Sequence, residues 1–450
     1  MNLTETNKTL KLAYPIILGE LAQMFLGLLD TAMVGAVSYK HLAAAALVMS
    51  VINIPFVLGI GITISVSQLV SMANGQRDGA LVSHYLFNGF LLSAITAVLI
   101  SLGLECSKEI LFHLGQDKEV ALLAVPYMSL MGWSVIPMLL FMALKQFTDG
   151  LEFTKTAMML SLLAIPLNFG LNWLLIFGHW GFPRMELIGA GWGTFISRTV
   201  IFIALGSVVL RHHIFRKYIA VGRRQWVVKW QTMRDLLHIG LPSSLQLGME
   251  SGAFAVSGII IGTIGAREQA AHQIAITLAA TTFMVSMGLS QAGSIRVSNA
   301  FGRKDWCHVR IIGKTTITAA LCYGTICAIA FVCLRHYLPM LFTGDLEVLK
   351  ITATLLFFAA IFQVSDSTQA ISAGLLRGIK DVRIPTFFVA LAYWIVGLPI
   401  GCLLAFYFQM KAMGIWIGFI IGLTISALLL SSRFLKISRR GMDHKPVRFS

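Results

Sequence analysis

The protein has 450 residues, of which 57% are hydrophobic and only 12% are charged, and its mean hydropathy is +0.79. A soluble globular protein of this length carries roughly twice that charged fraction, so the composition excludes an ordinary soluble domain. The net charge of +15 does not indicate nucleic-acid binding, because the Lys and Arg residues lie in short segments between apolar stretches and in the C-terminal tail.

The first apolar stretch follows a polar segment, MNLTETNKTLK. Because this stretch is longer than the h-region of a secretory signal, we expect it to remain as a membrane helix. Apolar stretches of about twenty residues recur along the chain, each long enough to cross ~30 Å of hydrocarbon. They predict twelve spans, at residues 11–37, 42–74, 82–105, 119–147, 155–178, 187–212, 236–264, 268–300, 309–335, 347–377, 383–408 and 412–436.

Basic residues indicate which ends of these spans face the cytoplasm. The segment 213–235 and the C-terminal tail hold six Lys or Arg residues each, whereas the loops on the opposite side hold few. The positive-inside rule therefore predicts a multi-pass protein of the cytoplasmic (inner) membrane with both termini in the cytoplasm. Segment 213–235 also alternates basic residues with Trp226, Val227, Val228 and Trp230, a pattern typical of a connector on the anionic membrane surface.

The two halves of the chain are related by an internal repeat. An offset of 227 residues aligns Pro15 with Pro242, Gly35 with Gly262 and Asp78 with Asp305, with no gap over about 65 residues. Each half holds six spans, so both halves enter the membrane from the same side. A pseudo-two-fold axis along the membrane normal follows, as in two-bundle transporters that bind substrate near mid-bilayer.

The sequence thus predicts an all-α, polytopic membrane protein of 12 transmembrane helices in two six-helix bundles. The predicted domains are an N-terminal bundle at 1–212, a cytoplasmic interfacial linker at 213–235, and a C-terminal bundle with a basic tail at 236–450. A receptor or an intramembrane enzyme has no general need for such duplication, whereas an alternating-access transporter does.

Acidic residues within the spans are the first candidates for a functional site, because an ionisable group in hydrocarbon costs several kcal/mol. Asp30 lies toward the outer third of the first span, Glu250 near the middle of the seventh, and Asp366 in the tenth. A carboxylate pair in a low-dielectric cavity can bind a hard cation such as Na⁺, or exchange a proton. The alternative for Glu250 and Asp366 is a structural ion pair or a protonated, hydrogen-bonded carboxyl.

Uncharged polar and aromatic residues near these acids are further candidates. Asn168 and Asn172 are one turn apart in the fifth span and share a face, either in a binding site or in interhelical hydrogen bonds. Phe254 and Phe362, each one turn from Glu250 or Asp366, can line a site by cation–π contact, with ordinary packing as the alternative.

One basic residue, Arg198, falls inside the sixth span. Its depth allows it to reach Asp30 or Glu20 of the first span. We hypothesise that it is a counter-ion within the N-terminal bundle.

Near the outer end of the eighth span, we interpret His272 as a packed, neutral histidine rather than a proton relay. The six cysteines form no CxxC pair, so we expect small apolar residues rather than metal ligands or disulfides.

Five stretches of the sequence together form a pattern known from one family. They are QMFLGLLDTAMVG, which begins at Gln23 and contains Asp30, then PLNFGLN (166–172), AAHQIA (270–275), MGLSQAGSIRVSNAFG (287–302) and DSTQAISAGLLRGIKDVRIP (366–385). They resemble the multidrug and toxic compound extrusion (MATE) exporters, and in particular their NorM-like branch, and the first of them is similar to the motif of the first helix of that family. The resemblance covers essentially the whole chain.

This resemblance implies a twelve-helix antiporter that exports cationic and amphipathic compounds in exchange for Na⁺ or H⁺. It implies cation coupling by Glu250 and Asp366, the residues we expect to hold Na⁺, and a second acidic position at Asp30 with Asn168 and Asn172 near it. Glu250 favours the NorM-like over the DinF-like branch. Two departures from the family pattern are Arg198 and the pair Lys380-Asp381.

From these observations we expect a secondary antiporter, a monomer that binds small organic cations and needs no cofactor beyond the coupling ion. A lipid-linked precursor flippase of the related superfamily is the alternative, although such a protein holds phosphates with Arg or Lys, and the midplane candidates here are mostly acidic. A channel fits the duplicated bundles and buried acids less well. The sequence contains no HExxH, GxSxG or Walker A motif, which disfavours an enzyme or an ATP-driven pump.

Overall fold

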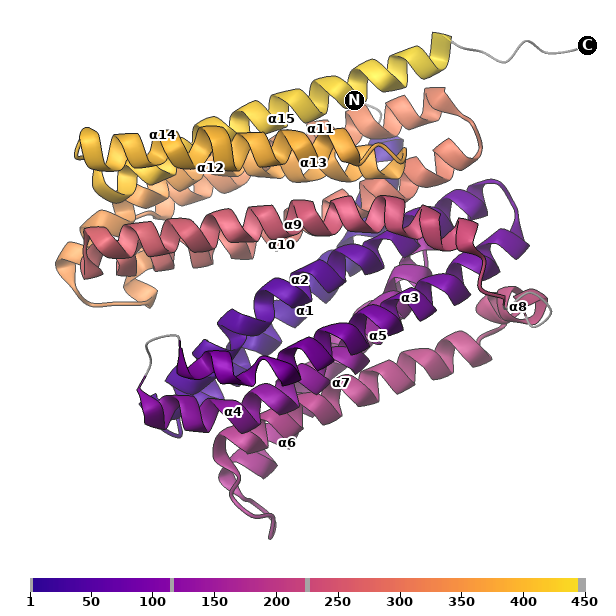
Figure 1. The fold of residues 1–450 in the computed structure, drawn as a ribbon. Coiled ribbons are helices and arrows are strands. Elements are labelled where there is room, and N and C mark those ends of the chain that lie inside the picture. Colours follow the sequence, from indigo (N-terminus) through magenta and orange to yellow (C-terminus); the bar gives the residue numbers. More distant parts are fainter. Residues whose placement is uncertain (1–2, 114–116, 223–226, 444–450) are drawn as a thin grey trace, which may run out of the picture. The chain divides into compact units, whose positions relative to one another are not determined.

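The computed structural model describes residues 3–113, 117–222 and 227–443, and these residues form helices and no strands (Figure 1). Twelve helical segments are long and apolar enough to cross a membrane, which confirms the predicted number of spans and the all-α fold class. The chain divides into two compact units. The N-terminal unit is Leu18–Ser244, and the C-terminal unit combines the described residues of Met1–Ile17 and Leu245–Ser450.

The helices follow one another with short connections. Most of α1 and all of the next helices belong to the N-terminal unit: α1 (Leu3–Gly35), α2 (Tyr39–Gly75), α3 (Gly79–Cys106), η1 (Lys108–Phe112), α4 (Lys118–Trp133), α5 (Val135–Gly150), α6 (Thr154–Phe177), α7 (Glu186–Arg211) and α8 (His213–Gly222). The C-terminal unit contains most of α9 (Trp230–Ile264), then α10 (Ala266–Gly302), α11 (Trp306–Leu334), η2 (Leu338–Leu341), α12 (Leu346–Gly378), α13 (Arg383–Ala390), η3 (Leu391–Gly397), α14 (Leu398–Cys402), η4 (Leu403–Tyr407) and α15 (Lys411–Asp443).

Two helices, α1 and α9, are each shared between the units. The change from one unit to the other follows Ile17 in α1 and Ser244 in α9, in each case two residues after a proline inside the helix, Pro15 or Pro242. A proline removes one backbone hydrogen bond and lets the helix bend there. Packing thus groups residues 3–17 with the C-terminal unit, and residues 213–222 and 227–244 with the N-terminal unit.

The turns that follow α2 and α10 have the same local structure, as the repeat predicts. Arg77 and Lys304 each adopt a left-handed conformation, with φ of 58° and 59°. The next residues, Asp78 and Asp305, then accept hydrogen bonds from the backbone at the start of α3 and α11, at 2.9 and 3.0 Å. An aspartate at this position caps the free N–H groups of a new helix. The offset of 227 residues is thus visible in backbone geometry.

Two predicted spans are not uniform α-helices. The fourth is broken at Ser134, where α4 ends and α5 begins. The eleventh, Arg383–Tyr407, contains the two π-helical segments η3 and η4. Gly418 of α15 lies against Gly397 and Gly401, where a Cβ atom would collide with their backbone. Small residues let helices approach closely inside a membrane, where packing rather than the hydrophobic effect holds them together.

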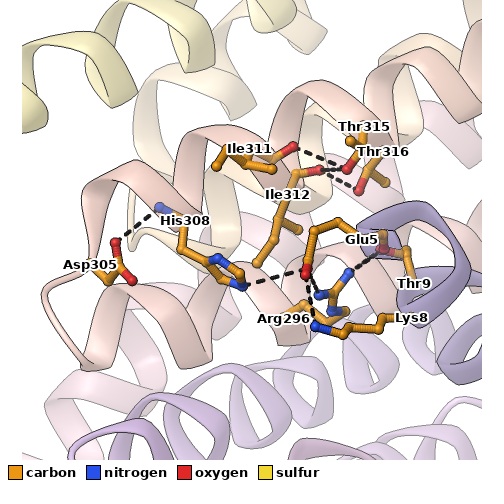
Figure 2. Close-up of polar contacts among 10 residues, drawn as sticks. All are labelled: Glu5, Lys8, Thr9, Arg296, Asp305, His308, Ile311, Ile312, Thr315 and Thr316. Atoms are coloured by element: carbon orange, nitrogen blue, oxygen red, sulfur yellow. Dashed lines mark hydrogen bonds and ion pairs between the residues drawn. The ribbon is translucent and has the colours of Figure 1, made fainter. Parts of the chain in front are cut away.

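The first turns of α1 are fixed in the C-terminal unit by a buried group of charges, which we call the Glu5 clamp (Figure 2). The Glu5 carboxylate forms ion pairs with Arg296 of α10 and Lys8, and lies 3.5 Å from His308 Nε2 of α11. Arg296 Nη1 also donates to the Glu5 carbonyl oxygen at 2.8 Å and to Thr9 Oγ1 at 2.5 Å. The contact between Glu5 and Arg296 explains why α1 begins at Leu3 rather than at the predicted residue 11.

The predicted interfacial linker is partly described. Helix α8 is followed by residues 227–229, which contact α3: Lys229 Nζ lies 2.9 Å from His84 Nε2, and its backbone N–H donates to Asn88 Oδ1 at 3.2 Å. Val227, Val228 and Trp230 are exposed. Residues 223–226, with Arg223, Arg224 and Trp226, and residues 444–450, with Lys445 and Arg448, lie outside the described ranges.

Candidate functional site

Asp30 lies in a group of neutral hydrogen-bond donors within the N-terminal unit. Asn172 Nδ2 of α6 donates to Asp30 Oδ1 at 2.6 Å, and Thr194 Oγ1 of α7 donates to Oδ2 at 3.2 Å. Asn172 Nδ2 also donates to Asn168 Oδ1 at 3.1 Å. Both asparagines are fully buried, and Asp30 is partly buried. We call Asp30, Asn168, Asn172 and Thr194 the Asp30 cluster. It brings together three residues that the sequence singled out.

Two features of this cluster escaped sequence reasoning. Thr194 is one, because a threonine in a membrane helix carries no signal of its own. The other is Gly193, since a Cβ atom there would overlap Asn172 Oδ1. Within the described part of the chain, Asn172 Oδ1 and Asn168 Nδ2 have no hydrogen-bond partner. The cluster thus contains a carboxylate and amide oxygen that are suited to a hard cation.

Arg198 of α7 does not form the predicted ion pair. Its Nη1 donates to Ser134 Oγ at 2.7 Å, at the break between α4 and α5. No carboxylate oxygen among the described residues lies within 4.0 Å of it. The attraction between Arg198 and Asp30 acts over a longer range. The counter-ion hypothesis therefore has no direct contact in its support.

Glu20 has a partner that the sequence analysis overlooked. Lys145 of α5 is buried and lies 2.9 Å from Glu20 Oε1 and 3.6 Å from Asp149 Oδ2. Lys145 lies near the predicted end of the fourth span, where a basic residue usually faces the cytoplasmic surface, so its charge gave no signal. A lysine with two carboxylates indicates a structural ion-pair network, because each charge has an opposite one in contact.

Glu250 of α9 is held by two glutamines of the C-terminal unit. Gln369 Nε2 of α12 donates to Glu250 Oε1 at 2.7 Å, and Gln246 Nε2 donates to the same oxygen at 3.2 Å. Asp366 lies one turn before Gln369 on α12 and is 3% exposed. Neither carboxyl group has a basic side chain within 4.0 Å among the described residues. The structural ion pair that we considered for these two acids is therefore absent from this part of the chain.

Aromatic rings pack beside this acid pair. Phe254 contacts Phe362, Tyr393 and Phe419, with ring centroids 6.1, 5.9 and 5.0 Å apart. Phe362 also contacts Trp416, against which His272 packs. These contacts match the packing alternative for Phe254 and Phe362.

Gln23 of α1 is partly buried and forms no hydrogen bond with the described residues.

Similarity to known proteins identifies the family of this chain. A profile of the MatE family matches residues 15–174 and 242–403, one match in each half of the chain. The chain belongs to the MatE family. Its two matched segments begin at Pro15 and Pro242, the two prolines that the repeat aligned.

Curated relatives of this MatE protein share nearly its full length. A probable multidrug resistance protein NorM of Rhodopseudomonas palustris is 35% identical over 443 residues, covering 98% of this chain and 93% of the relative. A protein of the same name from Brucella suis is 33% identical and covers 97% of this chain and 93% of the relative. The family relationship confirms the NorM-like resemblance and makes the protein a membrane transporter rather than an enzyme.

Solved structures show the same fold. The crystal structure of the eukaryotic MATE transporter AtDTX14 has a TM-score of 0.87 at 20% identity, covering 98% of this chain and 99% of that one. An outward-facing multidrug resistance MATE family transporter of the MOP superfamily has a TM-score of 0.90 at 18% identity, with coverages of 98% and 97%. At these identities the likeness establishes the fold alone.

Proposed function

We propose that the protein is a secondary antiporter of the cytoplasmic membrane that exports cationic and amphipathic small molecules in exchange for Na⁺ or H⁺. In this proposal both termini face the cytoplasm and the protein functions as a monomer. The names of its NorM relatives support multidrug export. One observation supports ion coupling above all: Asp30, Glu250 and Asp366 lie in helices that can span a membrane, and no cation of the described residues contacts any of them. Asp30 and Glu250 instead accept hydrogen bonds from neutral amides.

A carboxylate can couple ion binding to transport only if its charge is not already neutralised by a contacting cation. A carboxylate with a lysine or arginine in contact is already neutralised, and a cation binds there only by displacing that partner. Glu250 has two amide donors instead, so its carboxylate can still take up Na⁺ or a proton. The side-chain amides of Gln246 and Gln369 can rotate so that oxygen and nitrogen exchange places. Their oxygens then supply further hard ligands.

Alternating access then requires only that the two ligands prefer different states of the transporter. In the outward-facing state Na⁺ or H⁺ binds at Glu250 and Asp366, or at Asp30, and lowers the affinity for the exported compound, which leaves. The reloaded transporter returns to the inward-facing state and takes up the next molecule. The driving force is the ion gradient.

The test uses purified protein in liposomes that contain ethidium. Inward gradients of Na⁺ and of H⁺ are imposed separately, for the wild type and for Asp30→Asn, Glu250→Gln and Asp366→Asn. Glu347→Gln serves as the matched control, because Glu347 is an exposed acid paired with Arg267. We expect one gradient to drive efflux, with a loss of about tenfold or more in at least one of the three variants and none in the control.

The proposal fails if neither gradient drives efflux from correctly folded protein, or if all three variants transport as well as the wild type. The lipid-linked flippase alternative predicts movement of a labelled anionic lipid instead. A cavity within the membrane-spanning part of the N-terminal unit has a single basic residue, Arg198, among the residues that line it. This composition disfavours a multiply charged phosphate cargo.

A further inference from the structure

Arg198 is a cation inside a membrane-spanning helix with no acid in contact among the described residues. It lies twelve residues after Glu186, the first residue of α7, or about 18 Å along the helix axis. An arginine at such depth is costly unless a partner or a polar cavity compensates its charge. Of the two acids that we expected it to reach, Glu20 contacts Lys145 instead, and Asp30 makes no direct contact with it.

The position of the guanidinium group is fixed by a hydrogen bond to Ser134, the residue between helices α4 and α5. Ser134, between α4 and α5, is fully buried and donates to the carbonyl oxygen of Met131 at 2.7 Å. Its hydroxyl oxygen therefore faces Arg198 as an acceptor, and Arg198 Nη1 donates to it at 2.7 Å. A neutral hydroxyl orients the guanidinium but adds no counter-charge, and Asp30 attracts this cation only over a longer range.

A cavity lies beside this group. It has a volume of about 320 Å³, at the lower end of the size range of small-molecule sites. Its lining includes Arg198, Met131 of α4, and one stretch of α2 with Met49, Ser50, Asn53 and Phe56. All of these residues belong to the N-terminal unit. The Asn53 side chain is exposed and has no hydrogen-bond partner among the described residues.

We propose that this cavity binds the carboxylate of amphipathic aromatic substrates, with Arg198 as the residue that selects for the negative group. Guanidinium and carboxylate form charge-assisted, often bidentate hydrogen bonds. Asn53 provides an additional amide donor. Met49 and Met131 are flexible apolar side chains that adapt to rings of different shape, and Phe56 offers a flat aromatic contact.

This inference rests on the proposed export function and extends its substrate class. Asp30 and Glu250 attract compounds with a cationic group, whereas Arg198 favours compounds that also carry an acid. A zwitterionic aromatic compound would therefore bind this cavity more tightly than the same compound with its acid blocked. A membrane phospholipid is disfavoured as the ligand, because its phosphate lies at the membrane surface and Arg198 lies about 18 Å along α7.

The experiment uses a matched pair of fluorescent dyes, a carboxy-rhodamine and its methyl ester. The two dyes have the same cationic ring system and differ in one negative charge. Binding is measured by fluorescence anisotropy on full-length protein in nanodiscs of phosphatidylcholine, which contain no anionic lipid. The variants are Arg198→Gln, Arg198→Lys and Asn53→Leu, and Arg211→Gln at the exposed end of the same helix is the control.

We expect Arg198→Gln to weaken binding of the free acid by about tenfold or more while changing binding of the ester less than about twofold. Arg198→Lys should restore part of the affinity, because it keeps the charge but not the bidentate geometry. Asn53→Leu changes only an exposed side chain, so it tests the cavity even if Arg198→Gln fails to fold. We expect it to weaken binding of the free acid by a few fold.

The proposal is overturned if the wild type binds the ester as tightly as the free acid, or if Arg198→Gln and Asn53→Leu leave the preference unchanged. Equal weakening of both dyes by Arg198→Gln, with no selective effect of Asn53→Leu, also overturns it, since that pattern indicates a purely structural arginine. Efflux of both dyes from liposomes is measured separately. Selective binding without efflux retains the carboxylate site and rejects the export function.

Discussion

Replacing Glu5 by glutamine should destabilise the protein more than replacing Arg296 by methionine, although both changes break the same ion pair. Glu5 is 6% exposed and Arg296 is 8% exposed. After Glu5→Gln, Arg296 keeps two neutral acceptors, the Glu5 carbonyl and Thr9 Oγ1, but no carboxylate within 4.0 Å among the described residues. Breaking a buried ion pair on one side costs about 3–5 kcal/mol, and the two remaining acceptors place this case near 3 kcal/mol.

After Arg296→Met, by contrast, the Glu5 carboxylate keeps Lys8 at 2.8 Å and His308 at 3.5 Å. The methionine also fills much of the volume of the arginine stem. We therefore expect a smaller loss of about 1.5 kcal/mol, the lower end of the range for hydrogen bonds to a charged group. Lys8 has 57% of its side chain exposed, so Lys8→Met should cost less than about 1 kcal/mol and is the control.

The assay is equilibrium unfolding in detergent, followed by tryptophan fluorescence, with the double variant Glu5→Gln/Arg296→Met to close the cycle. We expect the double variant to be more stable than Glu5→Gln alone, because it removes the uncompensated guanidinium. Hydrogen exchange at residues 3–17 should rise in Glu5→Gln. Equal losses in the two single variants, or a double variant less stable than both, would refute this account of the clamp.

Further predictions concern single contacts in each unit. Lys145→Met leaves the buried Asp149 and the partly buried Glu20 without their cation, so we expect a loss of about 3 kcal/mol in the same unfolding assay. Gly193→Ala forces Asn172 away from Asp30, and we expect slower ion-driven efflux, whereas Gly206→Ala on the same helix meets only an ordinary contact at 3.7 Å and should transport normally. Ser134→Ala removes the acceptor that orients Arg198; we expect it to lower the carboxy-rhodamine preference several-fold without changing binding of the ester.

The sequence predicted the membrane-spanning helices well because hydropathy and helix length are local properties. It predicted their ends less well where tertiary contacts decide. The polar residues 3–10 join α1 because Glu5 contacts Arg296, which is 291 positions away along the chain. The break at Ser134 has a signal that we did not use, because Gly132 precedes it and Pro137 follows it. A proline cannot donate to the carbonyl oxygen four residues before it, which here is that of Trp133, the last residue of α4.

For the candidate site, sequence reasoning found depth and helical face but not the partner across helices. The shared face of Asn168 and Asn172 followed from their spacing, and the structure places Asn172 in contact with Asp30. Depth alone made Arg198 a partner for Asp30 or Glu20, whereas Lys145 contacts Glu20 and Arg198 contacts Ser134. Rotation of one helix relative to its neighbours depends on packing of the whole bundle, which hydropathy and spacing do not encode.

Four buried or partly buried acids fall into two groups by the charge of their partners, and we propose that this distinction separates structural from coupling roles. Glu5 and Glu20 contact basic side chains, so neutralising either acid should lower stability and leave coupling intact in the protein that still folds. Asp30 and Glu250 accept hydrogen bonds from neutral amides. Because no cation among the described residues contacts either acid, neutralising it breaks no ion pair. Asp30→Asn weakens only the longer-range attraction to Arg198, so the folded state loses little. Asp30→Asn and Glu250→Gln should therefore unfold like the wild type but lose the response to the ion gradient, whereas Glu5→Gln should show the opposite. If stability and coupling fall together in all four positions, partner charge is not what separates the two roles.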